Sequence, residues 1–515
     1  MPARLVLVLG DHLAPDHPAL RDADPAETVV CMAEVRHEAD LFPNHRQRLA
    51  YFFSAMRHFA AARREGGWTV DYQELTEASG ADSLPAFLRA KIREHAPEAV
   101  VMVEAGRLSL EAEIREVCEA EGVPLDLREN DHFACSRAEF AEWLDGRKRV
   151  LMYDFYRSLR TRHGILLDEA GGPEGGSWSL DAENQQSFGK KGPGLLPDAK
   201  RPAASGLSQD VVAMVNEQFP DGWGETESFA WPVTPEAAEA AFETFVTERL
   251  PEFGTFQDAM WTQQPWLYHA LISPAMNVGL IEPLAMARRV EAAYRAGKVP
   301  INAAEGFIRQ ILGWREFMRG VYTAFHDRLH TDNVLEAHEP LPEFYWTGET
   351  HMACVRDVVT QLQEHAYAHH IQRLMVTGLF AQLLGVEPLA VHAWYMAYYV
   401  DSVEWVTLPN VIGMSQFATG SLFTTKPYVA SGAYVDRMSN YCSGCRYNPK
   451  EASGEKACPF TTLYWDFLSR HRALLEGNNR MAFQLRNLDR KTPEALEAIG
   501  ERADGVRAMA REGTL

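Results

Sequence analysis

An alternation of short β-rich runs with helical stretches over residues 1–145 constrains the fold more than any other feature. The β-rich runs are "RLVLVLGD", "TVVCMAEV", "WTVDYQEL", "AVVMVEAG" and "PLDLREN". Helical stretches such as "HRQRLAYFFSAMRHFAAARREG" and "LEAEIREVCEAEG" lie between them. Strands that alternate with helices predict an α/β domain, with a parallel sheet covered by helices on both faces.

Ligands of such sheets bind beyond the carboxyl ends of the strands. This rule places Gly10, Asp11, Glu34 and Glu38 near any ligand site of the domain. The alternative is that Gly10 and Asp11 form only a tight turn, and without further information that reading is the simpler one.

The composition changes after this region. Residues 165–235 are rich in glycine, proline and serine and predict a long connection, in which Trp178, Asp181 and Asn184 indicate a segment that packs onto something. From residue 236 onward long amphipathic runs predict an all-α structure. The expected organisation is an α/β domain over 1–145, an interdomain connection over 146–235, and a helical domain over 236–515.

The charge and hydropathy exclude some classes of protein. No apolar run approaches the roughly 18 residues of a membrane helix, and the apolar run at the N-terminus is too short for a signal peptide. We therefore expect a cytoplasmic protein.

The net charge is −21, and it is unevenly distributed along the chain. Residues 1–250 carry 26 Lys and Arg against 43 Asp and Glu, whereas residues 251–515 carry 24 Lys and Arg against 28 Asp and Glu. A phosphate-binding face in the second half is compatible with this distribution.

Three of the seven cysteines lie within seventeen residues, in "CSGCRYNPKEASGEKACP". Cytoplasmic thiols stay reduced, so the cluster of Cys442, Cys445 and Cys458 indicates a metal site rather than disulfides. Cys354 is the only other cysteine in the helical half and is the natural fourth ligand. The spacing leaves zinc and an iron–sulfur cluster both open, with Cys-Pro leaning toward the latter.

Histidines and aromatic residues cluster in two helical segments. The sequence predicts one continuous helix through "AYAHHIQRLMVTG" and the preceding His365, with His365 and His369 on one face. No metalloprotease pattern accompanies these histidines, so they suit proton transfer better than metal binding. In "VHAWYMAYYVDSVEW" five aromatic residues crowd twelve positions. They are either the core stripe of a helix or carriers of electrons beside a redox cofactor.

Several stretches together resemble the photolyase/cryptochrome family, and within it the bacterial iron–sulfur branch of prokaryotic (6-4) photolyases and related cryptochromes. They span nearly the whole chain in order: "LVLVLGDHL", "FFSAMRHFA", "WSLDAEN", "EGFIRQILGWREFMRG", "FYWTG", "AYAHHIQRLM", "EWVTLPNVIGMSQFA", "TKPY", "YCSGCRY" and "ACPF". The resemblance implies a Rossmann-like antenna domain and an all-α domain that binds FAD.

The resemblance also implies roles for individual residues. Cys354, Cys442, Cys445 and Cys458 would hold a [4Fe–4S] cluster, and Asp11 and Glu38 would contact a 6,7-dimethyl-8-ribityllumazine antenna. In the family, an Arg and an Asp twenty-eight residues apart hold the flavin ring, and Arg373 and Asp401 have that spacing. Thr407 stands where the family has an asparagine near flavin N5. The other expected FAD contacts are His269, Ser273, Glu305, Arg309 and Trp314.

The implied activity is that of a (6-4) DNA photolyase, a carbon–carbon lyase that acts as a monomer on UV-damaged DNA. Light-excited, reduced FAD would pass an electron to the (6-4) pyrimidine dimer, His370 would donate a proton with support from His369, and the electron would return. The residues expected to carry electrons to FAD are Trp394, Tyr395, Trp346 and Tyr434. The alternative is a cryptochrome-type blue-light photoreceptor that regulates genes and repairs weakly.

Overall fold

A computed structural model of the protein describes residues 2–78 and 80–515, and its N-terminal part contains one five-stranded parallel sheet. The strand order is β3-β2-β1-β4-β5, and Leu5 of the central strand pairs with Val29 on one side and Val100 on the other. The strands are β1 (Arg4–Leu7), β2 (Thr28–Ala33), β3 (Thr69–Gln73), β4 (Ala99–Val103) and β5 (Leu125–Arg128). All five predicted strands are confirmed.

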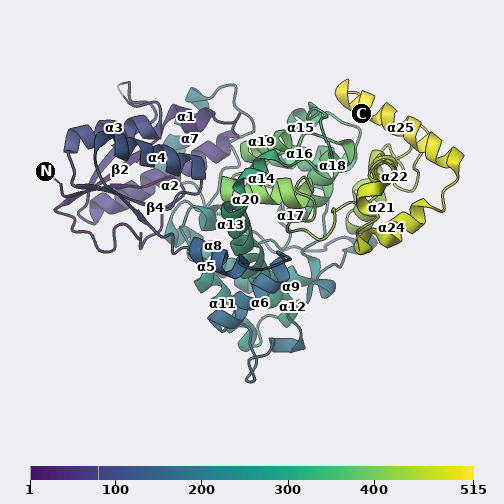
Figure 1. Cartoon of the computed structure of the whole chain (residues 1–515), viewed down its shortest axis with the longest axis horizontal. Coiled ribbons are helices and arrows are strands. Elements are labelled where there is room, and N and C mark those ends of the chain that lie inside the picture. Colours follow the sequence, from purple (N-terminus) through teal and green to yellow (C-terminus); the bar gives the residue numbers. More distant parts are fainter. Residues whose placement is uncertain (1, 79) are drawn as a thin grey trace.

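Alternation along the strands divides the side chains between the two faces of this sheet. Leu5 and Leu7 pack with one set of helices, whereas Val6 and Val8 belong to a different core on the opposite face. Helices α3 and α4 cover the first face, and α2 covers the second. The helices of this part are α1 (Arg36–Asp40), α2 (Arg46–Glu65), α3 (Leu84–His95), α4 (Leu108–Glu121) and α5 (Arg137–Leu144). Helices on both faces confirm the prediction (Figure 1).

The described part of the chain from residue 145 onward contains helices and no further strand. Figure 1 shows this part beside and below the sheet domain, with the N-terminus and the C-terminus at opposite ends. The first helices are α6 (Met152–His163), α7 (Gly206–Gln218), α8 (Pro235–Glu248), α9 (Leu250–Phe256), α10 (Ser273–Asn277), α11 (Pro283–Arg295), α12 (Ile301–Ile308), α13 (Glu316–Ala324), α14 (His326–Thr331) and α15 (Phe344–Thr347). They are followed by α16 (Ala353–His365), α17 (His370–Gln372), α18 (Leu379–Leu384), α19 (Pro388–Tyr398), α20 (Glu404–Pro409), α21 (Gly432–Met438), α22 (Pro459–Arg470), α23 (Arg472–Leu475), α24 (Ala482–Leu488) and α25 (Pro493–Arg511).

Three segments of the helical part are π-helices, in which the backbone hydrogen bonds span five residues instead of four. They are η4 (Arg309–Arg315), η5 (Arg373–Gly378) and η6 (Asn410–Ser415), and each continues directly from or into an α-helix. The 3₁₀-helices are η1 (Glu174–Gly176), η2 (Asp181–Glu183), η3 (Gly189–Lys191), η7 (Tyr441–Gly444) and η8 (Asn479–Met481).

The region between the sheet and residue 236 is more ordered than its composition suggests. It contains α6 and α7, and α7 packs against α2 of the sheet domain. Asn184 is fully buried and exchanges amide hydrogen bonds with Asn302, donating to its backbone oxygen at 3.1 Å. The prediction that this segment packs onto another part of the protein is confirmed.

The prediction of one continuous helix through "AYAHHIQRLMVTG" is wrong. Helix α16 ends at His365, Ala366 adopts a left-handed conformation with φ of 53°, and α17 begins only at His370. His365 and His369 therefore do not share a helical face. Because His369 has an extended backbone and His370 is helical, the side chains of the two residues point in different directions.

Among the described residues, no helix is both long enough and apolar enough to cross a bilayer.

Candidate functional site

A cavity of about 290 Å³ lies in the helical part, and all three π-helical segments contribute to its wall. This volume is near the lower end of the range for small-molecule sites, about 300–1,000 Å³. A π-helical turn displaces side chains from their α-helical positions, and such turns are frequent at functional sites. A Cβ on Gly378 of η5 would collide with the hydroxyl oxygen of Ser415 in η6, so glycine is needed where these two segments meet.

An ion pair between Arg373 and Asp401 lies in the wall of this cavity. The guanidinium donates two hydrogen bonds to the carboxylate, at 2.9 and 3.0 Å, and its remaining Nε–H bonds to the backbone oxygen of Ala368. Ser273 donates a further hydrogen bond to Asp401 at 2.6 Å, and the Arg373 guanidinium lies 4.1 Å from the ring centre of Tyr399. The pair is therefore held rigidly, with one edge toward the cavity.

Three histidines lie beside this ion pair. The rings of His269 and His369 stack at 4.3 Å between centres, and burial is the main reason that the pKa of each lies below its usual value, for His269 at about 3. Both ring nitrogens of His369 are buried without a hydrogen-bond partner. Such orphaned polar atoms in a cavity wall fit a site that a polar ligand completes.

His370 differs from its neighbour because its ring is exposed at the cavity, whereas His369 is 1% exposed. Desolvation by the surrounding protein is the main reason that the pKa of His370 lies below its usual value, and the positive charge of Arg373 lowers it further. At neutral pH the imidazole is mainly uncharged, with one nitrogen free to accept a proton and the other donating a hydrogen bond; its protonated form can give a proton up.

The structure brings most of the expected flavin contacts into this one cavity. His269, Ser273, Trp314 and Thr407 line it together with the residues above. Asn410 also lines it, three residues after Thr407, and was not identified from the sequence. A carboxamide is therefore present in the cavity although the position named from the family holds threonine.

Glu305 and Arg309 do not line the cavity. Buried Glu305 bonds to the hydroxyl of Tyr156 at 3.1 Å and to the backbone N–H of Leu180 at 3.0 Å, and Arg309 pairs with Asp181 at 2.8 Å. These contacts hold the connecting segment against α12 and η4. The role that the structure supports for both residues is to fix that segment beside the cavity.

The four cysteines named from the sequence line one small pocket in the C-terminal part. They come from the first turn of α16, from η7 and its end, and from the N-cap of α22; the four are Cys354, Cys442, Cys445 and Cys458. None forms a disulfide. Burial is the main reason that the pKa of Cys354 is raised, and the neighbouring cysteines raise it further. The same causes raise the pKa of Cys442 to about 12.

The spacing of these sulfurs distinguishes between kinds of metal centre. A single tetrahedral zinc ion with Zn–S bonds of about 2.3 Å would place its sulfurs roughly 3.8 Å apart. No three of the four sulfur atoms lie within 4.8 Å of one another in the described structure. The donor set is all-thiolate and more widely spaced than one zinc ion requires, so it fits a larger metal cluster.

Aromatic rings form a continuous path from the cavity toward the surface. Tyr395 lines the cavity, and its ring lies 5.1 Å from that of Trp394, centre to centre. The path continues through Tyr398 and Trp346 to Trp223, with successive centre-to-centre distances of 5.4, 5.4 and 5.2 Å. Trp394 is fully buried, whereas the last two tryptophans are half-buried.

Two members of this path were missed from the sequence, and one expected member does not join it. Tyr398 follows Trp394 by four residues on α19, which is a recognisable helical spacing. Trp223 lies in the connecting region and carries no such signal. Tyr434 is on α21 beside Arg437, and no aromatic contact among the described residues links it to the path.

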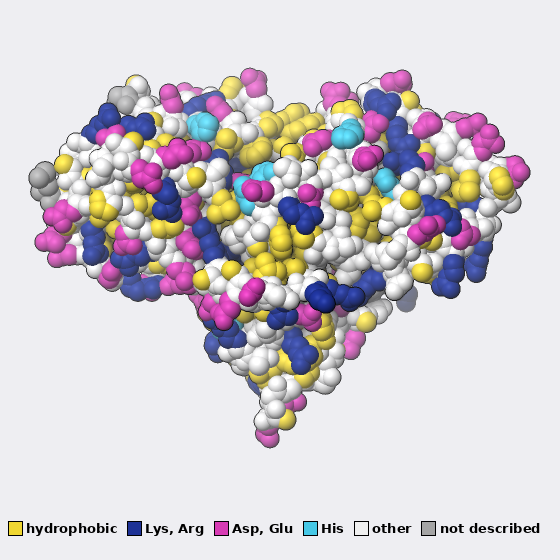
Figure 2. Space-filling model, viewed as in Figure 1, with side chains coloured by type: hydrophobic (Ala, Val, Ile, Leu, Met, Phe, Trp, Pro, Cys, Tyr) yellow, Lys and Arg dark blue, Asp and Glu magenta, His cyan; other side chains and the backbone are white. Residues whose placement is uncertain are grey.

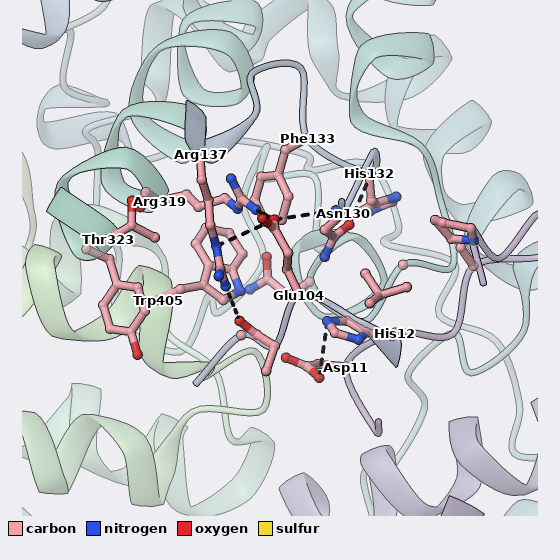
Figure 3. Close-up of a pocket in the computed structure, with 18 of the residues that line it drawn as sticks. Asp11, His12, Glu104, Asn130, His132, Phe133, Arg137, Arg319, Thr323 and Trp405 are labelled. Carbon is pink, nitrogen blue, oxygen red and sulfur yellow. Dashed lines mark hydrogen bonds and ion pairs between the residues drawn. The ribbon is translucent and has the colours of Figure 1, made fainter. Parts of the chain in front are cut away.

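A second pocket lies at the carboxyl ends of β1, β4 and β5, where the sheet meets α13 and α20 (Figure 3). Glu104 is at its centre and accepts from Arg319 at 2.7 Å, with Arg137 3.5 Å away. Asp11 lies at the other side of the pocket, 3.7 Å from His12. The position of Asp11 at the ligand edge of the sheet agrees with the strand-end rule.

This pocket does not fit the expected antenna as it stands. Its volume is about 30 Å³, room for roughly two water molecules, whereas a ribityl lumazine has a bicyclic ring and a five-carbon chain. Glu38 does not line the pocket; it pairs with Arg107 at 2.6 Å, next to Gly106 in the pocket wall. The two expected antenna residues therefore lie on the same edge of the sheet but not in one cavity.

Comparisons with known proteins agree with this arrangement. A family model described as deoxyribodipyrimidine photo-lyase-related protein matches residues 6–231. A protein of Agrobacterium fabrum named (6-4) photolyase is 44% identical over 485 residues, which cover 93% of this chain and 94% of that protein.

Two solved structures share the fold at low sequence identity. A bacterial class III photolyase from Agrobacterium tumefaciens matches with a TM-score of 0.59 at 16% identity, over 99% of this chain and 98% of the other. A cryptochrome of Synechocystis sp. PCC6803 matches with a TM-score of 0.57 at 14% identity, over 92% and 94%. With near-complete coverage of a relative at 44% identity, and with the cavity and sheet domain described above, the chain belongs to the photolyase/cryptochrome family.

Proposed function

We propose that this protein repairs (6-4) pyrimidine–pyrimidone photoproducts in DNA, using light and a reduced FAD bound in the cavity of the three π-helical segments. The observation that carries the proposal is the position of His370, exposed in a cavity whose wall contains the paired Arg373 and Asp401. The relative that is 44% identical and named (6-4) photolyase supports the same activity.

The residues of the cavity fit a flavin. Apolar side chains make up much of the wall, and its polar groups include the ion pair, the unpartnered His369, Thr407 and Asn410. FAD bound there would supply one electron to the lesion after excitation by light. Arg373 and Asp401 would hold the polar edge of the ring, and the lesion would enter the cavity flipped out of the duplex.

His370 is the proton donor in this proposal. The imidazolium form of His370 can deliver a proton to the lesion and recover it later, as a positioned general acid and base does. His369 is buried against His269 and supports the position of the start of α17, which carries His370.

We also infer that the four-cysteine pocket holds a [4Fe–4S] cluster. All-thiolate donors with wide spacing favour a cluster over zinc. A lumazine antenna is proposed at the sheet edge near Asp11 and Glu38, where side chains must move to admit it, and no step of repair is assigned to it.

Figure 2 shows lysine and arginine side chains mixed with acidic ones on the face in view, so we expect DNA binding to be local and lesion-dependent.

Repair should be tested with duplexes that carry one defined lesion. We expect the reduced protein under blue light to restore a (6-4) thymine pair to intact thymines, with no turnover in the dark and much less on a cyclobutane dimer. Product analysis by chromatography measures this. Failure on both lesions, with flavin present, would refute the proposal and favour the blue-light photoreceptor.

The aromatic path gives a second prediction. Electrons that reduce FAD should pass from the surface through Trp346 and Trp394, because oxidisable rings about 5 Å apart allow transfer in short steps. Trp346→Phe should keep the flavin content but lose most of the photoreduction, measured as bleaching of oxidised-flavin absorption under blue light. Tyr434→Phe is the informative comparison: if it stops photoreduction and Trp346→Phe does not, the path is wrong.

A further inference from the structure

Two histidines and a glutamate meet at the junction of the helical part with the sheet domain, outside the cavity described above. His326 and His330 are one turn apart on α14, and Glu404 is the first residue of α20. One ligand atom from each lies within 4.8 Å of one from both others. Figure 2 shows histidine side chains grouped with acidic ones in the area where Figure 1 places α14.

We propose that His326, His330 and Glu404 form a binding site for one divalent transition-metal ion of the zinc type. Both Nε2 atoms face the same carboxylate oxygen, at 3.9 Å for His326 and 3.7 Å for His330. Ligands of a tetrahedral zinc ion with bonds of about 2.0–2.1 Å lie roughly 3.3–3.5 Å apart. The two contacts to Glu404 would therefore need to shorten by only a few tenths of an ångström.

The geometry favours a metal ion over a simple ion pair. Both distances exceed the range of a hydrogen bond, so neither histidine is bonded to the glutamate directly. The rings of His326 and His330 lie 4.6 Å apart, and Tyr322 packs edge-on against His326 at 5.2 Å. Two converging imidazoles and one carboxylate suit zinc, cobalt, nickel or ferrous iron, and do not suit magnesium or calcium, which prefer oxygen ligands.

A third histidine, on α19, lies in the same region. His392 on α19 is 7% exposed, and its Nδ1 has no hydrogen-bond partner. It lies near enough to Glu404 and His330 for their charges to act on it, although burial dominates and lowers its pKa to about 4. His392 is not a member of the group whose ligand atoms lie within 4.8 Å of one another, so it is not counted among the ligands.

The site would connect parts of the protein that surround both pockets. Trp405, the next residue after Glu404, lines the pocket in Figure 3, and Thr407 lines the larger cavity. The backbone N–H of Leu108 in the sheet domain donates to the hydroxyl of Tyr322 at 3.1 Å, next to the cluster. A bound ion would thus stabilise α14 and α20 at the domain junction.

The test is titration of the purified holoprotein with ZnCl₂ buffered by a chelator, followed by calorimetry and metal analysis. We expect one zinc ion per chain, with the iron content unchanged. His330→Ala should weaken zinc binding by more than about 100-fold, because loss of even an outer-shell partner costs about 10- to 100-fold. His338→Ala removes an exposed histidine elsewhere and should change nothing.

Further measurements keep the result interpretable. Glu404→Gln preserves the shape of the side chain and should also abolish zinc binding, and an excess of MgCl₂ should not compete. Crystals soaked in ZnCl₂ should show an anomalous-scattering peak between the two Nε2 atoms and Glu404. Equal zinc affinity in wild type, His330→Ala and Glu404→Gln, or no zinc bound to wild type, would overturn the proposal.

Discussion

His370→Ala should abolish repair of (6-4) lesions almost completely while FAD, iron and photoreduction are retained. The loss is expected to be about 10²-fold or more, since a positioned general acid contributes about 10²- to 10⁴-fold. The physical reason is that the exposed imidazole at the cavity is the proton donor for the lesion. Repaired product per absorbed photon, measured with saturating lesion DNA, reports the effect.

Two controls separate chemistry from packing. His338→Ala changes an exposed histidine far along the chain and should leave repair intact. His369→Ala removes a ring stacked on His269 at 4.3 Å and should lower the thermal stability and the flavin content instead. If His370→Ala repaired at nearly the wild-type yield with flavin bound, His370 would not be the acid.

The pH dependence of repair follows from the same residue. Because desolvation by the surrounding protein and the charge of Arg373 lower the pKa of His370, the protonated imidazolium is a minor form at neutral pH and grows as the pH falls. The repair yield should therefore rise as the pH falls from 7 toward 5, on the approach to the pKa of about 4, and this rise should disappear in His370→Ala.

Cys442→Ala should remove the broad brown absorption of the iron–sulfur cluster and lower the stability of the helical part. The cluster would join α16 to the segment that leads into α22, and metal binding energy in such sites contributes to folding. If closure of the roughly 100-residue loop between Cys354 and Cys458 acts as a disulfide of that span does, its loss costs about 4–5 kcal/mol.

Cys118→Ala is the control, because Cys118 is a buried cysteine of the sheet domain and does not line the four-cysteine pocket. It should keep its full iron and sulfide content. Iron and acid-labile sulfide analysis, together with thermal unfolding, measure both variants. Wild-type protein that is soluble, yellow and free of iron would contradict the cluster.

The sequence predicted those features that depend on local pattern. The five strands were recognisable because buried parallel strands carry nearly continuous β-branched and apolar runs, as in "VVCMA" of β2. The Arg373–Asp401 pair was expected from the family resemblance rather than from local pattern, and the structure places the two side chains in hydrogen-bond contact.

Features that depend on the three-dimensional path of the chain were not predictable. The break after His365 occurs at Ala366, an alanine in a left-handed conformation, where no glycine or proline marks the end of the helix. Trp223 joins the aromatic path only because the connecting region returns to Trp346. Glu305 and Arg309 have the expected residue types but face the connecting segment.

The three π-helical segments have a consequence for how the sequence can tolerate insertions and deletions. A π-helical turn contains about one residue more than an α-helical turn, so deleting one residue from η4, η5 or η6 would restore a regular helix without breaking it. The helix beyond the deletion would keep its orientation, because the wider turn holds the extra residue locally, and only the side chains of that turn would move. In family alignments, a single-residue gap at 309–315, 373–378 or 410–415 would therefore mark a chain whose cavity wall presents different side chains.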